Sequence, residues 1–153
     1  MSKRYVPGPA PLNADPWSVR ELQAVAQALW KGELVAIIVA CSDETTALTT
    51  GTAKVTFRSP CAFTLTGVRA SVTTAPTGAT LLTVDINQGG TSVISTKLTF
   101  DASEKTTLTA ATPAVISNRD IANDAELTID IDAVGSTIAG AGLKVTLLGN
   151  VVQ

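Results

Sequence analysis

From Leu34 to the C-terminus, apolar residues recur at every second position, and no helical periodicity is present. A period of two is the pattern of a strand with one buried face, so this long segment predicts an all-β domain. Threonine, valine and isoleucine are frequent in it, and their branched β-carbons suit a pleated strand. Residues 1–31 follow different rules, and we therefore expect a β-sandwich domain at 34–153 that carries its own N-terminal attachment.

About eight strands can be placed in this domain from the alternation and from the turn residues between strands. The first is a continuous apolar run at Leu34–Ala40. Within 62–72 the inward positions slip by one residue at Thr66-Gly67, which indicates a β-bulge, and Gly89-Gly90 predicts a hairpin loop. Ala53, Val55 and Phe57 are expected on one face of a strand, as are Leu82, Val84 and Ile86 on the next, and beyond the hairpin the chain continues through Ile94, Thr96, Leu98 and Phe100. A weaker strand at 108–116 is interrupted by Pro113, so it lies at an edge or contains a break. Leu127, Ile129 and Ile131 face inward, and Leu143, Val145 and Leu147 close the domain. This spacing predicts a sandwich or barrel and favours a jelly-roll-like β-sandwich.

The first fifteen residues predict an extended anchoring arm. Alternate prolines between Tyr5 and Pro11 remove backbone donors and hold the preceding residues in extended conformations. Such a segment can lie along another surface at low entropic cost. Its apolar content favours docking over the alternative, a disordered tail. The residues expected to contact a partner are Tyr5, Val6, Pro7, Pro9, Pro11, Leu12 and Trp17.

Residues 16–31 predict one short amphipathic helix. Asp15 can cap its first turn, Pro16 suits the first helical position, and Gly32 suits its end. The a/d seam expected on its apolar face consists of Val19, Leu22, Ala26 and Leu29. Two heptads are too short for a stable isolated helix. The seam therefore either packs on its own β-domain or meets copies of itself around a symmetry axis.

The composition limits the partners. Hydrophobic residues make up 45% of the chain and charged residues only 16%, which is apolar for a monomer and favours a homo-oligomer. The net charge of -2 and the lack of clustered Lys and Arg give no reason to expect nucleic-acid binding. No apolar run approaches the roughly 20 residues that a membrane helix requires. Cys41 and Cys61 lie beside apolar runs and predict buried thiols of a reducing compartment, with at most one disulfide.

The sequence offers little catalytic chemistry. Without histidine there is no Ser/His/Asp triad and no His-based zinc site. Asp130 and Asp132 share one face of a strand roughly 7 Å apart, and glycosidases need only two carboxylates. Aromatic residues are only 4% of the chain, however, and both tryptophans lie in the predicted helix, so a solvated polar face is favoured. Asp85 with these two aspartates lacks the spacing of an EF-hand. We expect no catalytic residue, no metal and no cofactor.

Several stretches resemble structural proteins of tailed bacteriophages. Ala75–Asn87, with Gly90–Thr96, looks like a β-domain that recurs in them, and Ser136–Val145 matches its closing strand. Tyr5–Pro11 is similar to the start of small podophage virion proteins, where a proline-rich arm precedes a helix. The resemblance implies a trimeric jelly-roll module of the virion, anchored through its N-terminus and without enzymatic activity. Nothing here resembles the β-helical shaft or sugar-binding tip of a tailspike.

We therefore expect a virion accessory protein, either a capsid decoration protein or a short head fibre, assembled in the host cytoplasm. A tail or neck fibre component involved in host attachment is the second interpretation, because the same N-terminus could insert into the tail. A carbohydrate-binding module is the third, since jelly rolls often bind sugars, although the β-domain has few aromatic residues to stack on them.

Overall fold

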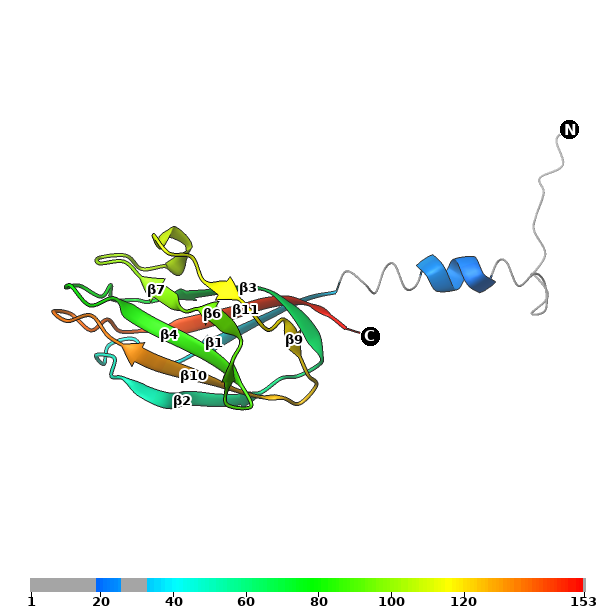
Figure 1. The fold of residues 1–153 in the computed structure, drawn as a ribbon, viewed down its shortest axis with the longest axis horizontal. Helices are drawn as coiled ribbons and strands as arrows, with labels where there is room; N and C mark the ends of the chain where they lie inside the picture. The colour runs from blue at the N-terminus through cyan, green and yellow to red at the C-terminus, as the bar shows by residue number, and fades with distance from the viewer. Residues whose placement is uncertain (1–18, 26–32, 153) are drawn as a thin grey trace, which may run out of the picture. The chain divides into compact units, whose positions relative to one another are not determined.

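A computed structural model describes residues 19–25 and 33–152 (Figure 1). The chain divides into two compact units, Met1–Glu33 and Leu34–Gln153. In the first unit, residues 19–25 are helical, in agreement with the predicted helix, and all seven are exposed. Outside the described residues lie both predicted ends of that helix, Ala26 and Leu29 of its seam, and the whole anchoring arm: Tyr5, Val6, Pro7, Pro9, Pro11, Leu12 and Trp17.

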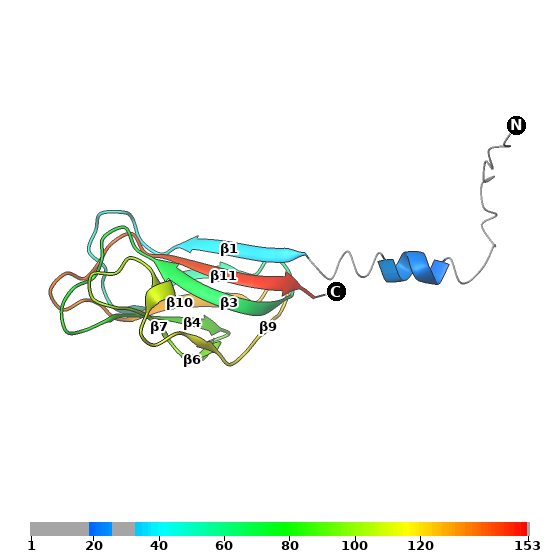
Figure 2. The ribbon, with the colours of Figure 1, turned by 90° about the horizontal axis from the view of Figure 1, so that it is seen from above.

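The second unit is a sandwich of two antiparallel sheets. In the first sheet the order is β1-β11-β3-β9, and Figure 2 shows β1, β11 and β3 side by side with β1 at a free edge. In the second the order is β2-β10-β4, and β4 also pairs with β5 and β7, while β6 and β8 form a separate ribbon. The bounds are β1 Leu34–Ala40, β2 Gly51–Arg58, β3 Phe63–Ser71, β4 Leu82–Gln88, β5 Thr91–Ser92, β6 Ile94–Thr96, β7 Leu98–Phe100, β8 Val115–Ile116, β9 Asp120–Ile121, β10 Glu126–Ala133 and β11 Lys144–Val151, with a 3-10 helix η1 at Thr107–Thr109.

The connectivity is that of a jelly roll. Successive strands β1, β2, β3 and β4 alternate between the sheets, and after β7 the chain crosses back through β9, β10 and β11. The two layers, β1-β11-β3-β9 and β2-β10-β4-β7, are thereby wound together by long antiparallel connections, as in two Greek keys. The prediction of an all-β, jelly-roll-like sandwich is confirmed.

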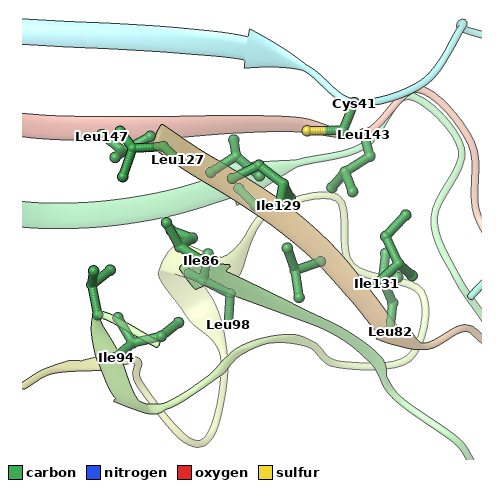
Figure 3. Close-up of a cluster of buried hydrophobic side chains, with 14 of the residues drawn as sticks. Cys41, Leu82, Ile86, Ile94, Leu98, Leu127, Ile129, Ile131, Leu143 and Leu147 are labelled. Atoms are coloured by element: carbon green, nitrogen blue, oxygen red, sulfur yellow. The ribbon is translucent and has the colours of Figure 1, made fainter. Parts of the chain in front are cut away.

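The core lies between the two sheets, where Figure 3 shows Leu and Ile side chains from both layers pointing toward one another. The apolar sets predicted for β4, for β10 and for the closing segment of Leu143 and β11 are all 0–1% exposed: Leu82, Val84, Ile86, Leu127, Ile129, Ile131, Leu143, Val145 and Leu147. Their alternation with outward polar residues is the direct result of the period-two pattern. The burial of these side chains confirms the faces predicted from the sequence.

Two predicted irregularities are also present. In the ladder between β3 and β11, Leu148 pairs with Gly67 but Gly149 pairs with Leu65, so Thr66 is the extra residue of a β-bulge. Between β4 and β5, Gly89 and Gly90 both adopt positive φ, 56° and 80°, which is the geometry of a two-residue type I′ hairpin. The sequence signals for both features are local, because each depends on only a few consecutive residues.

Two local predictions are wrong. Ala53 does not face inward: it has a φ of 48°, and its N–H donates to the Asp130 carboxylate at 2.7 Å, so β2 bulges away from its ladder. The expected strand at 94–100 breaks at Lys97, because β6 pairs with β8 whereas β7 pairs with β4.

The strand predicted at 108–116 is present only as β8, which follows the break expected at Pro113. This segment begins in η1, where the Thr106 hydroxyl caps the N–H of Leu108, and only β8 is extended. At Thr107 a side chain replaces the backbone as the hydrogen-bond partner of β3, because Thr107 Oγ1 accepts the N–H of Ala70 at 2.9 Å.

Candidate functional site

The predicted helical seam is the first candidate surface. Val19 is 49% exposed, Leu22 70% and Val25 56%. Their spacing of three residues places them along one side of the helix. Of the four predicted seam residues, the structure thus describes Val19 and Leu22, both helical and exposed, whereas Ala26 and Leu29 lie outside the described residues. An apolar stripe of this kind can bind another apolar surface, and its oligomeric role stays a prediction.

The outer face of the second sheet gathers three aspartates. Asp85 and Asp130 are direct cross-strand partners in β4 and β10, an arrangement in which like charges repel. Lys97 relieves the repulsion: its Nζ lies 3.0 Å from Asp85 and also pairs with Asp132. The hydrogen bonds with Asp132 and then with Asp85 raise the pKa of Lys97. The break between β6 and β7 therefore places the Lys97 ammonium within ion-pair distance of the carboxylates of Asp85 and Asp132.

The remaining acceptors of this network are also occupied. Asp85 is only 5% exposed and accepts from Ser92 Oγ at 2.6 Å and from the N–H of Ile86 at 2.8 Å. Asp130 accepts from Asn87 Nδ2 at 3.0 Å as well as from the Ala53 N–H. Each carboxylate thus has its own donors, and the network joins β2, β4, β10 and the segment around Lys97.

The described residues offer neither a metal site nor an unpaired buried polar side-chain atom. Among residues 19–25 and 33–152, no three His, Cys, Asp or Glu side chains are placed to hold a metal ion. In the same part of the chain, every buried side-chain nitrogen and oxygen has a hydrogen-bond partner. Asp130 and Asp132, considered above as a carboxylate pair, are half-buried and exposed respectively, and both are engaged in holding the sheet together.

The two cysteines are free thiols. Cys41 is buried as predicted, and burial raises its pKa to about 11, so the reactive thiolate is scarce near neutral pH. Cys61 is half-buried rather than buried. Cys41 therefore lacks the lowered pKa and the access to solvent that an activated nucleophile needs.

Two open grooves flank the outer side of β3. The larger, about 330 Å³, lies between the bulge at Thr66-Gly67 and β8, with Arg119 at its side. The guanidinium of Arg119 donates to the carbonyl of Leu65 at 3.4 Å. The smaller groove, about 250 Å³, lies beside η1 and is lined in part by Arg69 and Leu108. Neither brings together a set of ionisable groups. Ordinary ligand pockets begin at about 300 Å³, so the larger groove lies just above this limit and the smaller lies below it.

The sequence reasoning missed a second apolar surface. The outward side chains of β1 include Leu34, 70% exposed, and Ile38, 68% exposed, at the free edge of the first sheet. The sequence analysis predicted an apolar strand at Leu34–Ala40 but did not predict that one of its faces would be exposed. The signal was present, because the run lacks the polar residue at every second position that a half-exposed strand normally has.

In the described part of the chain, no helix is both long and apolar enough to cross a bilayer. Comparison with known proteins finds no matching family model, no matching curated sequence and no matching solved structure.

Proposed function

We propose that this chain is a non-enzymatic structural protein of a phage particle. Its N-terminal arm binds the capsid, its helix joins the copies into a trimer, and its jelly roll projects outward as a decoration protein or short head fibre. The observation that carries the proposal is the contrast between the two units. One is a sandwich with a complete core of its own, and the other presents an exposed apolar stripe at Val19, Leu22 and Val25.

The self-contained sandwich supports a role as a projecting module. Its core cluster runs from Cys41 to Leu147 and draws on both sheets. All of the residues in the cluster lie between positions 35 and 147, and none of the described helical residues 19–25 belongs to it. The outer aspartates are held by Lys97, Asn87 and backbone N–H groups, which favours a structural role for them. The resemblance of Ala75–Asn87, Gly90–Thr96 and Ser136–Val145 to phage β-domains supports the particle as its location.

The energetics of the helix favour several copies. Fully burying a Val or Leu side chain contributes about 1.5–3 kcal/mol, so three half-exposed ones contribute about 3–5 kcal/mol. Association costs at least about 4 kcal/mol in lost translational and rotational freedom. Each copy in an assembly buries its own stripe, so two helices gain about 6–10 kcal/mol and three gain about 9–15 kcal/mol, against association costs of at least about 4 and 8 kcal/mol. Trimerisation also joins three arms, and tethered arms bind a shell at high effective concentration.

Binding to the assembled shell gives the proposed mechanism. A protein that binds assembled capsid subunits and not free ones stabilises the shell by mass action. The arm supplies the contact, and its proline-fixed backbone loses little entropy on docking. Residues Tyr5, Val6, Leu12 and Trp17 would supply the apolar contacts, and Pro7, Pro9 and Pro11 would hold the backbone extended.

The test is binding to purified particles that lack the protein. Deletion of residues 1–15 should leave a folded oligomer that no longer sediments with the particles. The double variant Tyr5→Ser, Leu12→Ser keeps the prolines and the length of the arm and should weaken binding at least about tenfold. Asn13→Ser is the matched polar control and should bind as the unchanged chain does. Normal sedimentation of the deletion variant would contradict the role of the arm.

The number of copies per virion separates the head from the tail. Hundreds of copies in a quantified gel would indicate the shell, and around a dozen would indicate a tail or neck component. Absence of the chain from purified virions would overturn the proposal in both forms.

A further inference from the structure

The outer face of the second sheet places a lysine amine against a buried carboxylate. β4 lies between β7 and β10 (Figure 1). In the register of β4 and β7, Val84 pairs with Leu98, so the next position places Lys97 opposite Asp85. Lys97 Nζ lies 3.0 Å from Asp85 Oδ2, and Asp85 is buried. A buried ion pair by itself contributes little net stability, because desolvation offsets the attraction. The contact also brings a nucleophile to a carboxyl group.

Two donors converge on the other oxygen of Asp85. Its Oδ1 accepts from Ser92 Oγ at 2.6 Å and from the N–H of Ile86 at 2.8 Å, while Oδ2 faces Lys97. Donors fixed on the oxygen where negative charge develops during attack on a carbonyl form an oxyanion hole. The carboxyl group of Asp85 is therefore polarised through one oxygen and meets the amine at the other.

Asp132 brings a second carboxylate to the same amine. The register between β10 and β4 shifts between Ile131 and Ala133, so Asp132 is the extra residue of a β-bulge. Bulges of this kind re-aim a side chain. Asp132 Oδ2 pairs with Lys97 Nζ, and the Asp132 side chain is 34% exposed, against 8% for that of Asp85. Asp132 can therefore exchange protons with the amine and with water, whereas Asp85 is held in place.

We propose that Lys97 and Asp85 form an intramolecular isopeptide bond in the folded chain. The Lys97 ammonium gives a proton to the Asp132 carboxylate, and the neutral Nζ then forms a bond to Cγ of Asp85. The bond between Cγ and Oδ2 breaks, and Oδ2 leaves as water. Of the three ammonium protons, one stays on the amide nitrogen and two leave with Oδ2. Asp132 carries protons between them and ends as a carboxylate again, so no oxidant or other reactant is needed.

The folded state makes this condensation favourable. Groups held in reacting geometry reach effective molarities of about 10⁵ M or more, which favours closure over hydrolysis. The product is a neutral amide, so the cost of burying the carboxylate of Asp85 disappears. The hydrogen bonds with Asp132 and then with Asp85 raise the pKa of Lys97, so the neutral amine is a minor form. The reaction is therefore slow and follows folding.

The bond closes the segment between β4 and β7 covalently. This segment contains the glycine hairpin, β5 and β6. Closing a loop of the chain lowers the entropy of the unfolded state and so stabilises the fold. The inference goes beyond the proposed function, because it concerns the sandwich alone and holds wherever the chain assembles.

Another close pair in the same chain provides a comparison. Lys144 Nζ pairs with Glu44, but the two side chains are 37% and 56% exposed. In water both charges keep their hydration, and a carboxylate in that setting resists attack by an amine. Lys144 and Glu44 should therefore remain an ion pair.

Mass spectrometry of the purified full chain tests the proposal. The chain should weigh less than its sequence by one water molecule, and the loss should persist in urea. Trypsin should no longer cut after Lys97, so residues 70–105, bounded by Arg69 and Lys105, should appear as one peptide that lacks one water. Cleavage after Lys144 should be normal. A chain that keeps its sequence mass after days at neutral pH overturns the proposal. Water loss with normal cleavage after Lys97, as a succinimide would give, or a cross-link from Lys97 to Asp132 also overturns it.

Four variants separate the bond from the ion pair. Lys97→Arg keeps the charge without a free amine, so it should stay folded by circular dichroism and keep its sequence mass. In cell-free translation sampled over time, Ser92→Ala and Asp132→Ala should each slow the loss of water about tenfold or more. Ser95→Ala is the matched control, because the Ser95 hydroxyl bonds to the Val115 carbonyl and not to Asp85, and its rate should be unchanged. Water loss in Lys97→Arg overturns the bond, and unchanged rates in Ser92→Ala and Asp132→Ala overturn the roles given to these side chains.

Discussion

At the scale of single residues, Asp43 shows how one carboxylate organises the turn after β1. Its Oδ1 accepts the N–H of Thr46 at 2.6 Å and that of Thr45 at 2.9 Å, which is the pattern of an Asx turn. These hydrogen bonds, that of Thr46 first, lower the pKa of Asp43 to about 2 because they favour the charged form. The neighbouring Glu44 bonds to Lys144 and Thr73, and its pKa is lowered as well.

Asp43→Asn should reveal this charge as a pH-dependent part of the stability. A depressed pKa stabilises the fold above the unfolded value, 3.8, and this stabilisation is lost as the pH falls through about 2. Asparagine keeps the acceptor oxygen without the charge. The urea midpoint of the unchanged chain should therefore exceed that of Asp43→Asn by a constant amount at pH 5–7 and by less below pH 4.

Asp43→Ala provides the comparison for this measurement. It removes the acceptor as well as the charge, so it should lower the midpoint more than Asp43→Asn does at pH 7, and a deficit should remain at pH 2.5. A difference between Asp43→Asn and the unchanged chain that stays the same from pH 7 to pH 2 would contradict the assignment.

At the scale of elements, the bulge between β3 and β11 shows how two strands tolerate an extra residue. Thr66 lies outside the regular ladder, and its hydroxyl donates to the Leu148 carbonyl at 3.2 Å. Just past the bulge, Gly149 lies against the fully buried Phe63. A β-carbon at Gly149 would lie 2.5 Å from Phe63 Cδ2 and 2.6 Å from the Thr64 carbonyl oxygen. Only glycine permits the two strands to approach this closely.

Gly149→Ala should therefore destabilise the domain, whereas Gly67→Ala should not. Alanine at 149 forces a shift in a packed core, which costs about 1–3 kcal/mol. A β-carbon at Gly67 would meet Leu148 Cδ1 at an ordinary 3.6 Å, and the change should be within about 0.5 kcal/mol of neutral. Both glycines flank the same bulge, so the pair is a matched comparison in urea unfolding. Equal midpoints for the two variants would refute the close approach.

At the scale of the whole molecule, the division into two units separates folding from the proposed attachment. The core cluster of the sandwich lies within 34–152 and joins the two sheets through residues from β3, β4, β10 and β11. The proposed arm and seam lie within residues 1–33. Stability and assembly should therefore respond to different parts of the chain.

The fragment 34–153 should fold alone. Its urea unfolding should be a single cooperative transition, and its m-value should be close to that expected for about 120 residues, because the m-value follows the surface exposed on unfolding. Light scattering should show weaker association than in the full chain, since the helix is missing. A fragment that is unfolded by circular dichroism would show that residues 1–33 contribute to the fold.

The sequence by itself determined the long strands β3, β4, β10 and β11 and the faces that they bury. The inward sets of β4, β10 and β11, the bulge at Thr66 and the glycine hairpin at Gly89-Gly90 depend on residues next to one another, so a local pattern predicts them. The helix at 19–25 followed from its apolar spacing in the same way. The remaining predictions about the arm and the seam concern partners, and the single chain does not test them.

Only the tertiary structure decided which distant residues meet. Ala53 turns outward because its N–H reaches Asp130, 77 positions away, and the strand at 94–100 breaks where Lys97 pairs with Asp132, 35 positions away. The order of the strands in the first sheet left the outward side of β1, with Leu34 and Ile38, exposed at a free edge. Periodicity reports which side of a strand is apolar, whereas the neighbour that covers it is set by contacts between segments far apart in the chain.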